Sequence, residues 1–259
     1  MTVMVVLLFG GIIMENIELW QGDCLELMSN IKDKSIDMIL CDLPYGTTSC
    51  KWDIVIPFDK LWENYNRIIK DNGAIILFSK QPFTSDLINS NRELFRYELI
   101  WEKTRAGNSM QVKKQPASLH ENIEVFYKNQ PIYNDLKFRV DEKYIDKRKN
   151  IRDSFYNSEH YSGVMKRKAD DGYRHPQSIL PFNSVWEKGM HPTQKPVELL
   201  EWLIKSYTNE GFTILDNCMG SGSTGVACVN TNRKFIGIEK EEKYFEIAKR
   251  RIEEANNQT

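Results

Sequence analysis

The sequence contains no CxxC pair, no apolar run long enough to span a bilayer, and almost no net charge, since 35 basic residues face 36 acidic ones. Its cysteines are scattered and odd in number, namely Cys24, Cys41, Cys50, Cys218 and Cys228. This pattern argues against a metal site or a disulfide framework and favours a reducing cytoplasm. Without a global basic field, any binding to nucleic acid must come from a local patch.

The N-terminal segment from Thr2 to Ile13 carries no charge. It is too short to span a bilayer, and it lacks the basic region and the small-residue cleavage site of a signal peptide. Met14 then begins a sequence that reads like an ordinary start. We therefore expect residues 1–13 to be a dispensable extension or the product of a misassigned start codon, and we do not expect a membrane anchor.

Apolar periodicity predicts strands that alternate with helices along most of the chain. The expected strands are 17–20, 36–41, 74–78, 97–101, 122–127, 213–215 and 235–238. The expected helices are 24–31, 58–70, 81–89, 197–207, 224–229 and 241–255. This alternation predicts an α/β protein with a doubly wound, mostly parallel sheet.

Between residues 130 and 184 the apolar periodicity is lost, and charged residues mix with aromatic ones. We interpret this segment as an insertion into the α/β domain. The expected organisation is therefore an N-terminal extension at 1–13, a first half of the main domain at 14–129, the insertion at 130–184 and a second half at 185–259.

A glycine-rich turn follows the strand expected at 213–215. Gly220 to Gly225 fits G-x-G-x-x-G, in which glycines let a ligand approach the backbone and the next helix offers free N–H groups. Glu239 ends the following strand, where a carboxylate can accept hydrogen bonds from two ribose hydroxyls. Asp216 precedes the glycines, and its charge would repel a pyrophosphate but attract the ammonium of a methionine tail. The turn therefore favours S-adenosylmethionine over a nicotinamide dinucleotide.

A second turn, Asp42-Leu43-Pro44-Tyr45, follows the strand expected at 36–41 and suits a planar exocyclic amine. Conjugation with a base makes such an amine a poor nucleophile. The Asp42 carboxylate and the Pro44 carbonyl can hold its two hydrogens and so direct the nitrogen lone pair. Tyr45 offers a flat face on which a base taken out of the helix can stack. The alternative is a Pro-Tyr turn with an N-capping aspartate and no ligand.

Together with the segment His191 to Pro196 (HPTQKP), the two turns resemble the amino-group DNA methyltransferases of permuted motif order, the β class, in which the catalytic motif precedes the cofactor motif. In that family the catalytic motif is Asp, Asn or Ser, then Pro or an aliphatic residue, then Pro and an aromatic residue, so Leu43 is an accepted departure. The resemblance implies a Rossmann-like methyltransferase fold and S-adenosylmethionine as cofactor. The initial Asp42 leans toward adenine N6 rather than cytosine N4.

The resemblance also assigns residues to roles. The implied catalytic residues are Asp42, Pro44 and Tyr45. The residues implied in cofactor binding are Asp23, Asp42, His191, Thr193, Gln194, Lys195, Asp216, Gly220, Ser221, Gly222, Ser223, Thr224 and Glu239. The family's usual Asp-Pro-Phe appears here as Asp216-Asn217-Cys218, a departure from which we expect a less rigid turn.

Two basic segments are candidates for contacts with DNA. The first is a loop without acidic residues, whose candidates for phosphate contact are Lys103, Arg105, Lys113 and Lys114. The second, 137–174, holds eleven Lys or Arg and seven Asp or Glu with interleaved aromatics. The resemblance assigns target recognition to 130–184 and implies double-stranded DNA as the partner. It leaves open a homodimer and a cognate restriction nuclease.

Three other functions share some of these features. An RNA or protein glutamine methyltransferase would keep the chemistry, but such relatives usually carry Asn at the first catalytic position and an unpermuted motif order. A nicotinamide-dependent oxidoreductase would use the glycine turn and Glu239, but it leaves residues 42–45 and 191–196 unexplained. A DNA-binding module without catalysis would not need the catalytic motif. A site-specific adenine-N6 DNA methyltransferase therefore explains the most residues.

Overall fold

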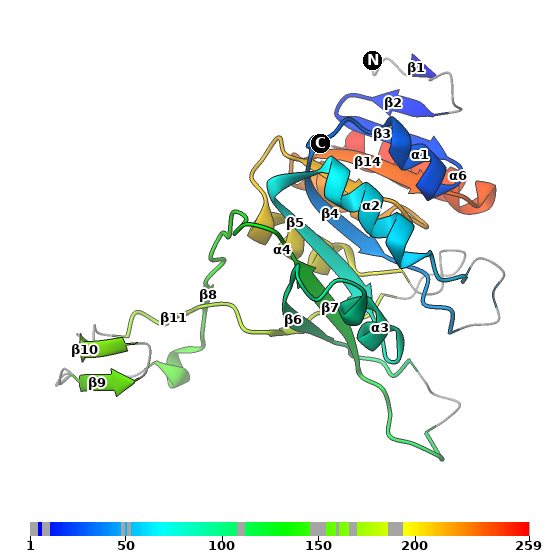
Figure 1. The fold of residues 1–259 in the computed structure, drawn as a ribbon. Coiled ribbons are helices and arrows are strands. Elements are labelled where there is room, and N and C mark those ends of the chain that lie inside the picture. Colours follow the sequence, from blue (N-terminus) through cyan, green and yellow to red (C-terminus); the bar gives the residue numbers. More distant parts are fainter. Residues whose placement is uncertain are drawn as a thin grey trace. The chain divides into compact units, whose positions relative to one another are not determined.

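The computed structural model describes residues 5–6, 11–47, 50, 53–107, 112–145, 154–158, 161–165, 170–185 and 194–258. The chain divides into two compact units. The larger unit comprises Met1–Asn134 and Ser178–Thr259, and the smaller unit comprises Asp135–Gln177. Figure 1 draws both units as ribbons.

The larger unit is built on one sheet, and nine of its strands follow β1 (Val5–Val6). They are β2 (Ile12–Met14), β3 (Ile17–Gln21), β4 (Ile36–Asp42), β5 (Ile69–Ser79), β6 (Phe95–Glu102), β7 (His120–Phe126), β12 (Ile179–Pro181), β13 (Thr213–Asp216) and β14 (Lys234–Glu239). Their spatial order is β1-β2-β3-β14-β13-β4-β5-β7-β6-β12. The central strands from β3 to β5 pair in parallel, and antiparallel pairs lie on either side. The predicted α/β class with a doubly wound, mostly parallel sheet is therefore confirmed.

Helices cover both faces of this sheet (Figure 1). One face carries α1 (Cys24–Leu27), α2 (Phe58–Ile68) and α3 (Phe83–Ser90), and the other carries α4 (Val197–Tyr207), α5 (Ser223–Asn230) and α6 (Glu242–Asn256). The apolar run of β4 serves both layers. Met38 and Leu40 lie in the core with α4 to α6, whereas Ile39 and Cys41 lie in the core with α1 to α3. Such two-sided burial explains why the strand reads as continuously apolar.

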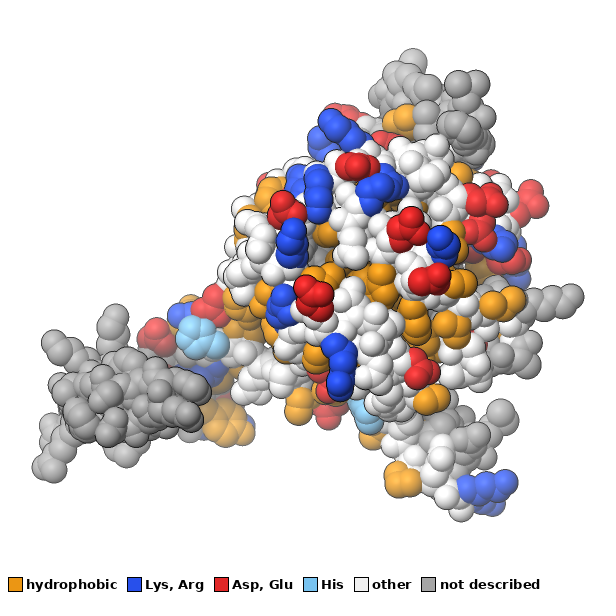
Figure 2. Space-filling view, viewed as in Figure 1, with side chains coloured by type: hydrophobic (Ala, Val, Ile, Leu, Met, Phe, Trp, Pro, Cys, Tyr) orange, Lys and Arg blue, Asp and Glu red, His pale blue; other side chains and the backbone are white. Residues whose placement is uncertain are grey.

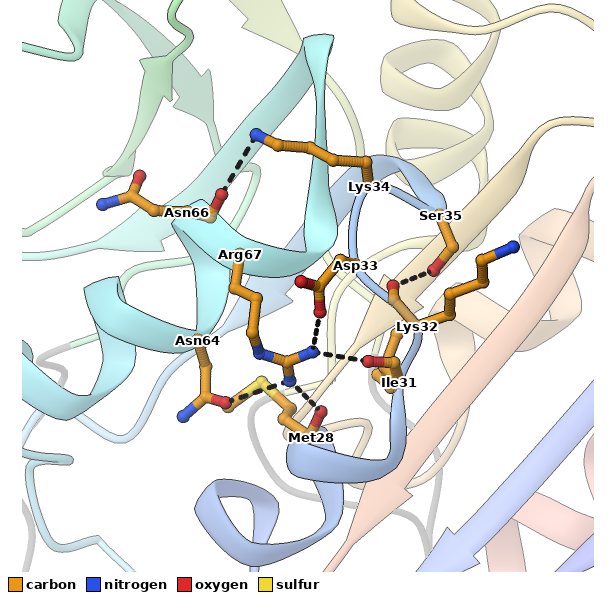
Figure 3. Close-up of polar contacts among 9 residues, drawn as sticks. All are labelled: Met28, Ile31, Lys32, Asp33, Lys34, Ser35, Asn64, Asn66 and Arg67. Atoms are coloured by element: carbon orange, nitrogen blue, oxygen red, sulfur yellow. Dashed lines mark hydrogen bonds and ion pairs between the residues drawn. The ribbon is translucent and has the colours of Figure 1, made fainter.

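Arg67, near the end of α2, binds the loop that leads into β4 (Figure 3). Its guanidinium donates to the carbonyls of Met28 and Ile31 at 2.7 Å each, and to the carboxylate of Asp33 at 2.7 Å. Hydrogen bonds from a guanidinium are stronger than neutral ones. These contacts hold the segment before β4, which is the strand that ends in the predicted catalytic motif.

Most predicted elements of the larger unit match the structure, and the helix predicted at 197–207 coincides with α4. The helix predicted at 58–70 is too long, because α2 ends at Ile68 and β5 begins at Ile69. Residues 71–73 lie within β5, although Asp71-Asn72-Gly73 is a sequence typical of a turn. Ile69 pairs with Ile36 of β4, and the register shifts before Ala74 pairs with Met38. Pairing with a buried neighbouring strand overrides the local turn signal here.

Two further boundaries differ from the expected organisation. Ile12 and Met14 are buried in β2, which pairs with β3, so part of the segment 1–13 contributes to the sheet edge. The smaller unit is shorter than the insertion expected at 130–184, because Ile179–Pro181 forms β12 beside β6.

The smaller unit contains two short antiparallel pairs within its described residues. β8 (Phe138–Arg139) pairs with β11 (Tyr173–Arg174), and β9 (Ser154–Ser158) pairs with β10 (Tyr161–Met165). The carboxylate of Asp170 accepts hydrogen bonds from two nitrogens of Arg174, each at 2.7 Å. A bidentate pair of this kind fixes the orientation of both side chains.

Charges of both signs are interspersed on the face of the larger unit seen in Figure 2, and hydrophobic side chains lie between them. This mixture agrees with the formal net charge of −1. None of the helices in the described part of the chain has the length and apolar character needed to cross a bilayer. Across the same described ranges, no group of His, Cys, Asp and Glu side chains is arranged to hold a metal ion.

Candidate active site

Four neighbouring strands bring the predicted site residues to one edge of the sheet. β3, β14, β13 and β4 are adjacent and parallel, so their carboxyl ends lie together. Residues at these ends line one cavity of about 720 Å³. Its lining includes residues of both predicted turns, namely Asp42, Pro44, Tyr45, Asp216, Gly220, Ser221, Ser223 and Thr224. The two turns therefore meet, although they are far apart in the sequence.

The glycine turn that joins β13 to α5 has a backbone shape that favours glycine. Gly220 has a φ of 53° and Gly222 has a φ of 79°. A side chain at position 222 would also collide with α6, because a Cβ atom there would lie 2.8 Å from Cβ of Ala248. Gly222 is thus required by packing, whereas Gly220 lines the cavity at the N-terminus of α5.

Glu239, at the end of β14, is held by backbone donors. Its Oε2 accepts a hydrogen bond from the N–H of Gly220 at 2.9 Å, and its Oε1 accepts one from the N–H of Glu241 at 2.8 Å. Burial raises the pKa of Glu239. Asp23, two residues after β3, caps α1 and pairs with Lys240 at 3.1 Å. Each carboxylate oxygen has a second lone pair for a hydroxyl or amine in the cavity.

Asp216 binds the turn that follows it. Its Oδ2 accepts a hydrogen bond from the Thr224 hydroxyl at 2.6 Å, and its Oδ1 accepts one from the N–H of Cys218 at 3.1 Å. Burial raises the pKa of Asp216 to about 6. Asn217 is anchored as well, because its Oδ1 accepts a hydrogen bond of 2.5 Å from the Tyr65 hydroxyl on α2. A buried side-chain hydrogen bond therefore stands where the family usually has the rigid ring of proline.

Three thiols, those of Cys24, Cys41 and Cys218, lie in the core beside the glycine turn, which we also call the cofactor turn. Contact with Cys218, and then burial, raise the pKa of Cys24, and burial raises the pKa of Cys41 to about 12. A thiol with a raised pKa stays protonated and is a weak nucleophile. Cys24 and Cys218 line the cavity, Cys41 is buried in the same core, and we interpret all three as packing residues.

Tyr45 folds back onto the predicted catalytic aspartate. Its hydroxyl donates to Oδ1 of Asp42 at 2.6 Å, and its ring centroid lies 5.1 Å from that of Phe83. Burial, followed by the charge of Asp42, raises the pKa of Tyr45. The tyrosine is therefore a protonated donor that orients Asp42, while its ring contributes to the cavity wall.

Asp53 is a supporting residue that the sequence analysis missed. Its two carboxylate oxygens accept hydrogen bonds from the backbone N–H groups of Gly46 at 2.8 Å and Thr47 at 2.9 Å. Gly46 has a φ of 68°, and Asp53 is buried. The carboxylate thus fixes the backbone turn immediately after Tyr45. An aspartate a few residues beyond a turn is too common a feature to have revealed this contact.

Lys195 lies on the acceptor side of the cavity, by which we mean the side formed by the turn from Asp42 to Tyr45. It donates to Oδ2 of Asp42 and lies 3.2 Å from Oε2 of Glu121 on β7. Burial alone would lower the pKa of Lys195, but the two carboxylates raise it. Burial likewise opposes ionisation of Glu121, but Lys195 and Lys103 outweigh it and lower its pKa. The lysine that the resemblance assigns to the cofactor is therefore paired with the predicted catalytic residue.

The remaining predicted residues fall in three groups. Gln194 lines the cavity, and its buried Oε1 has no hydrogen-bond partner among the described residues. His191 and Thr193 lie outside the described residues. Of the basic candidates, Lys103 and Arg105 both line the cavity, and Lys103 is paired with Glu121 at 2.7 Å. The other two, Lys113 and Lys114, are exposed.

An α/β sheet whose strand edge carries a cavity lined by an acidic glycine turn and an Asp-Leu-Pro-Tyr turn is the arrangement expected of an amino-group methyltransferase. Residues 36–250 match the sequence profile of a family described as DNA methylase. The chain belongs to this DNA methylase family.

Individual relatives agree with this assignment. The type II methyltransferase M2.MboI of Moraxella bovis is 33% identical, over 93% of this chain and 89% of its own. The DNA adenine methyltransferase YhdJ of Escherichia coli is 27% identical, over 91% of this chain and 82% of its own. The crystal structure of an M1.HpyAVI–SAM complex superposes with a TM-score of 0.60 at 26% identity, covering 91% of this chain and 98% of that one.

Proposed function

We propose that this protein is an S-adenosylmethionine-dependent DNA methyltransferase that methylates the N6 amino group of an adenine flipped out of double-stranded DNA at a specific sequence. The observation that carries the proposal is the meeting of the cofactor turn and the amine turn in one cavity. Membership of the DNA methylase family and a relative named a DNA adenine methyltransferase support it. Asp at the first catalytic position favours adenine N6 over cytosine N4.

The cofactor side of the cavity fits S-adenosylmethionine. Glu239 offers carboxylate lone pairs to ribose hydroxyls, and Asp216 places negative charge where the methionine ammonium is expected. Oε1 of Gln194 is buried without a partner among the described residues, so it is available to a donor on the ligand. A volume of about 720 Å³ is in the usual range for such sites. When bound, this cofactor supplies a methyl group carried on a positively charged sulfur.

On the acceptor side, the carboxylate of Asp42 and the carbonyl of Pro44 each accept one hydrogen of the target amine. These two acceptors would direct the nitrogen lone pair toward the methyl group that the bound cofactor would supply, and the electrons of the carbon–sulfur bond would remain on sulfur. The cationic nitrogen afterwards releases one proton to water. Because positive charge develops on the nitrogen, a fixed carboxylate beside it stabilises the transition state. The ring of Tyr45 stacks on the flipped base.

Contacts with DNA fall to parts of both units. Arg105, Lys113 and Lys114 contact phosphates, because their side chains are exposed, whereas Lys103 supports the site internally. The smaller unit, with the exposed aromatics Phe138, Tyr144 and Tyr173, reads the target sequence.

The proposal extends to the cellular setting. The enzyme acts in the cytoplasm as a homodimer, and it protects DNA from a cognate restriction nuclease. The name of the relative M2.MboI as a type II methyltransferase supports the last point. Sedimentation equilibrium tests the dimer, and nuclease resistance of DNA from an expressing host tests the protection.

Transfer of tritium from methyl-labelled cofactor to unmethylated DNA tests the function. We expect label in DNA, recovered as N6-methyladenine after digestion to nucleosides. Asp42→Ala should lower the rate by more than about 100-fold, because it removes a group that binds the reacting nitrogen. Circular dichroism and thermal unfolding show that the variant is folded. Label found only in N4-methylcytosine, RNA or protein contradicts the proposal.

A further inference from the structure

Four side chains of alternating charge connect the loop after β6 with the predicted catalytic aspartate. Lys103 contacts Glu121, Glu121 contacts Lys195, and Lys195 contacts Asp42. The side chains of Lys195, Lys103 and Glu121 are 5%, 8% and 15% exposed. Charges so far removed from water interact more strongly than surface pairs. Neutralising one of these side chains therefore changes the electrostatic energy of the other three.

The two lysines differ in what they contact besides Glu121. Nζ of Lys195 lies 5.0 Å from the ring centroid of Phe78, on β5, and it donates to Asp42. Nζ of Lys103 lies 5.4 Å from the ring centroid of Trp101 and does not reach the catalytic turn. Glu121 therefore stands between a cation that is paired with Asp42 and one that is paired only with Glu121 among the described carboxylates.

This arrangement has an electrostatic consequence for methyl transfer. A cation beside Asp42 opposes the positive charge that develops on the target nitrogen. Glu121 offsets that cation, since its Oε2 lies 3.2 Å from Nζ of Lys195. With Glu121 neutral, two buried ammonium groups would face one carboxylate, and the site would gain one positive charge.

We propose that Glu121 is a positioning residue for methyl transfer: it holds Lys195 and balances its charge, so that Asp42 is fixed in place and retains its full effect on the target nitrogen. The inference rests on the proposed function. Glu121 lines the cavity beside Lys195, and we expect it to act on the rate of the chemical step rather than on binding.

The primary test is Glu121→Gln, which removes the charge and keeps the shape. With cofactor and DNA both saturating, the single-turnover rate should fall by about 10- to 100-fold, as expected for loss of an electrostatic contribution to a transition state. The dissociation constants for S-adenosylhomocysteine, by calorimetry, and for DNA should change by less than about threefold. A rate within about twofold of the wild type, or weaker binding at an unchanged rate, overturns the proposal.

A charge-rescue variant separates balance from scaffolding. Lys103→Met combined with Glu121→Gln removes one charge of each sign and restores the neutral site. We expect this double variant to transfer methyl groups at least about fivefold faster than Glu121→Gln alone. The reason is that the surplus positive charge, which opposes the charge developing on the target nitrogen, is gone. If the double variant is as slow as the single one, Glu121 acts only by holding Lys103, and the proposal is wrong.

Folding of the variants is checked by thermal unfolding. If Glu121→Gln does not fold, Glu121→Asp carries the test, since it keeps the charge but shortens the reach to Lys195; an unchanged rate then overturns the proposal. The matched control is Glu102→Gln, an exposed glutamate on β6, which should transfer at the wild-type rate. Failure of the proposed function is distinguishable, because the wild type itself would then not label DNA.

Discussion

The two sides of the cavity are held together by different kinds of contact. On the cofactor side, carboxylates accept hydrogen bonds from nearby backbone: Asp216 from residue 218, and Glu239 from Gly220. On the acceptor side, Asp42 is bound by Lys195, which lies 153 positions further along the chain, and Lys195 is bound by Glu121. One side is built from short segments and backbone donors, and the other from ion pairs between separate elements.

The difference suits the two tasks. Backbone donors in a turn have fixed positions, so the cofactor side is organised before a ligand arrives. The ion pairs of the acceptor side depend on the balance of charge among four side chains, which is the property that matters when charge develops on a nitrogen. We therefore expect substitutions on the cofactor side to change binding and substitutions on the acceptor side to change rate.

Among the variants that test this difference, Lys195→Met should give the largest effect. Removing the cation leaves Asp42 without its side-chain anchor and leaves Glu121 with only Lys103, so we expect the single-turnover rate to fall by about 100-fold. The dissociation constant for S-adenosylhomocysteine, by calorimetry, should change by less than about threefold. Lys205→Met, at a half-exposed lysine on α4, is the control. A large loss of cofactor affinity at an unchanged rate would show that Lys195 acts in cofactor binding instead.

Asp216→Asn, on the cofactor side, should change binding rather than rate. The amide can keep hydrogen bonds to the turn, but it loses the charge that attracts the methionine ammonium, so we expect cofactor affinity to fall by at least about tenfold. The rate at saturating cofactor should stay within about threefold of the wild type. Calorimetry and single-turnover kinetics measure the two quantities. If the variant is slower at saturating cofactor while its affinity for the cofactor is normal, the assignment of Asp216 to cofactor binding is contradicted.

The same substitution has a pH signature. Burial raises the pKa of Asp216 from 3.8 to about 6, so the folded protein holds the proton more tightly than the unfolded chain. The protonated Asp216 carboxyl therefore contributes its full stabilisation of the folded state below pH 3.8, and this contribution is lost as the pH rises through 6. Asp216→Asn removes this cost, and we expect it to raise the free energy of unfolding by about 3 kcal/mol at pH 7.5. Denaturant titrations should show little difference between the two proteins near pH 4.

Asp53→Ala tests the support of the acceptor turn. It removes the acceptor of two backbone N–H groups, those of Gly46 and Thr47. We expect the free energy of unfolding to fall by about 1–3 kcal/mol and the rate to fall by about tenfold, since the turn that carries Tyr45 loosens. Denaturant titration and single-turnover kinetics measure both. Asp59→Ala, at an exposed position on α2, is the control, and equal behaviour of the two variants would refute this role for Asp53.

Tyr65→Phe should have the smallest effect. The substitution leaves the buried Oδ1 of Asn217 without its donor, so we expect a loss of about 1 kcal/mol in the free energy of unfolding. Cofactor affinity should fall by less than about threefold, because Asp216 and Glu239 keep their own backbone donors. An unchanged stability would show that this hydrogen bond does not replace the rigidity of a proline.

The sequence was sufficient to predict the strands that carry both turns, since continuous apolar runs end in Asp42 and Asp216. It was also sufficient to place Asp216, Gly220 and Glu239 at one edge of the sheet, because their strands are parallel neighbours; their role in binding the cofactor stays a prediction. It could not predict that Lys195 pairs with both Asp42 and Glu121, because pairing between side chains so distant in sequence depends on how β4, β7 and the segment before α4 are brought together. The support from Asp53 was missed for a related reason, since the turn geometry that it stabilises is visible only in three dimensions.

A crystal structure of the complex with S-adenosylhomocysteine is the most direct test of the central claim that one pocket joins the two turns. The account predicts the ribose beside Glu239, the amino acid moiety at Asp216 and the sulfur facing Asp42. A ligand bound elsewhere, or one whose sulfur faces away from Asp42 and Tyr45, would contradict it.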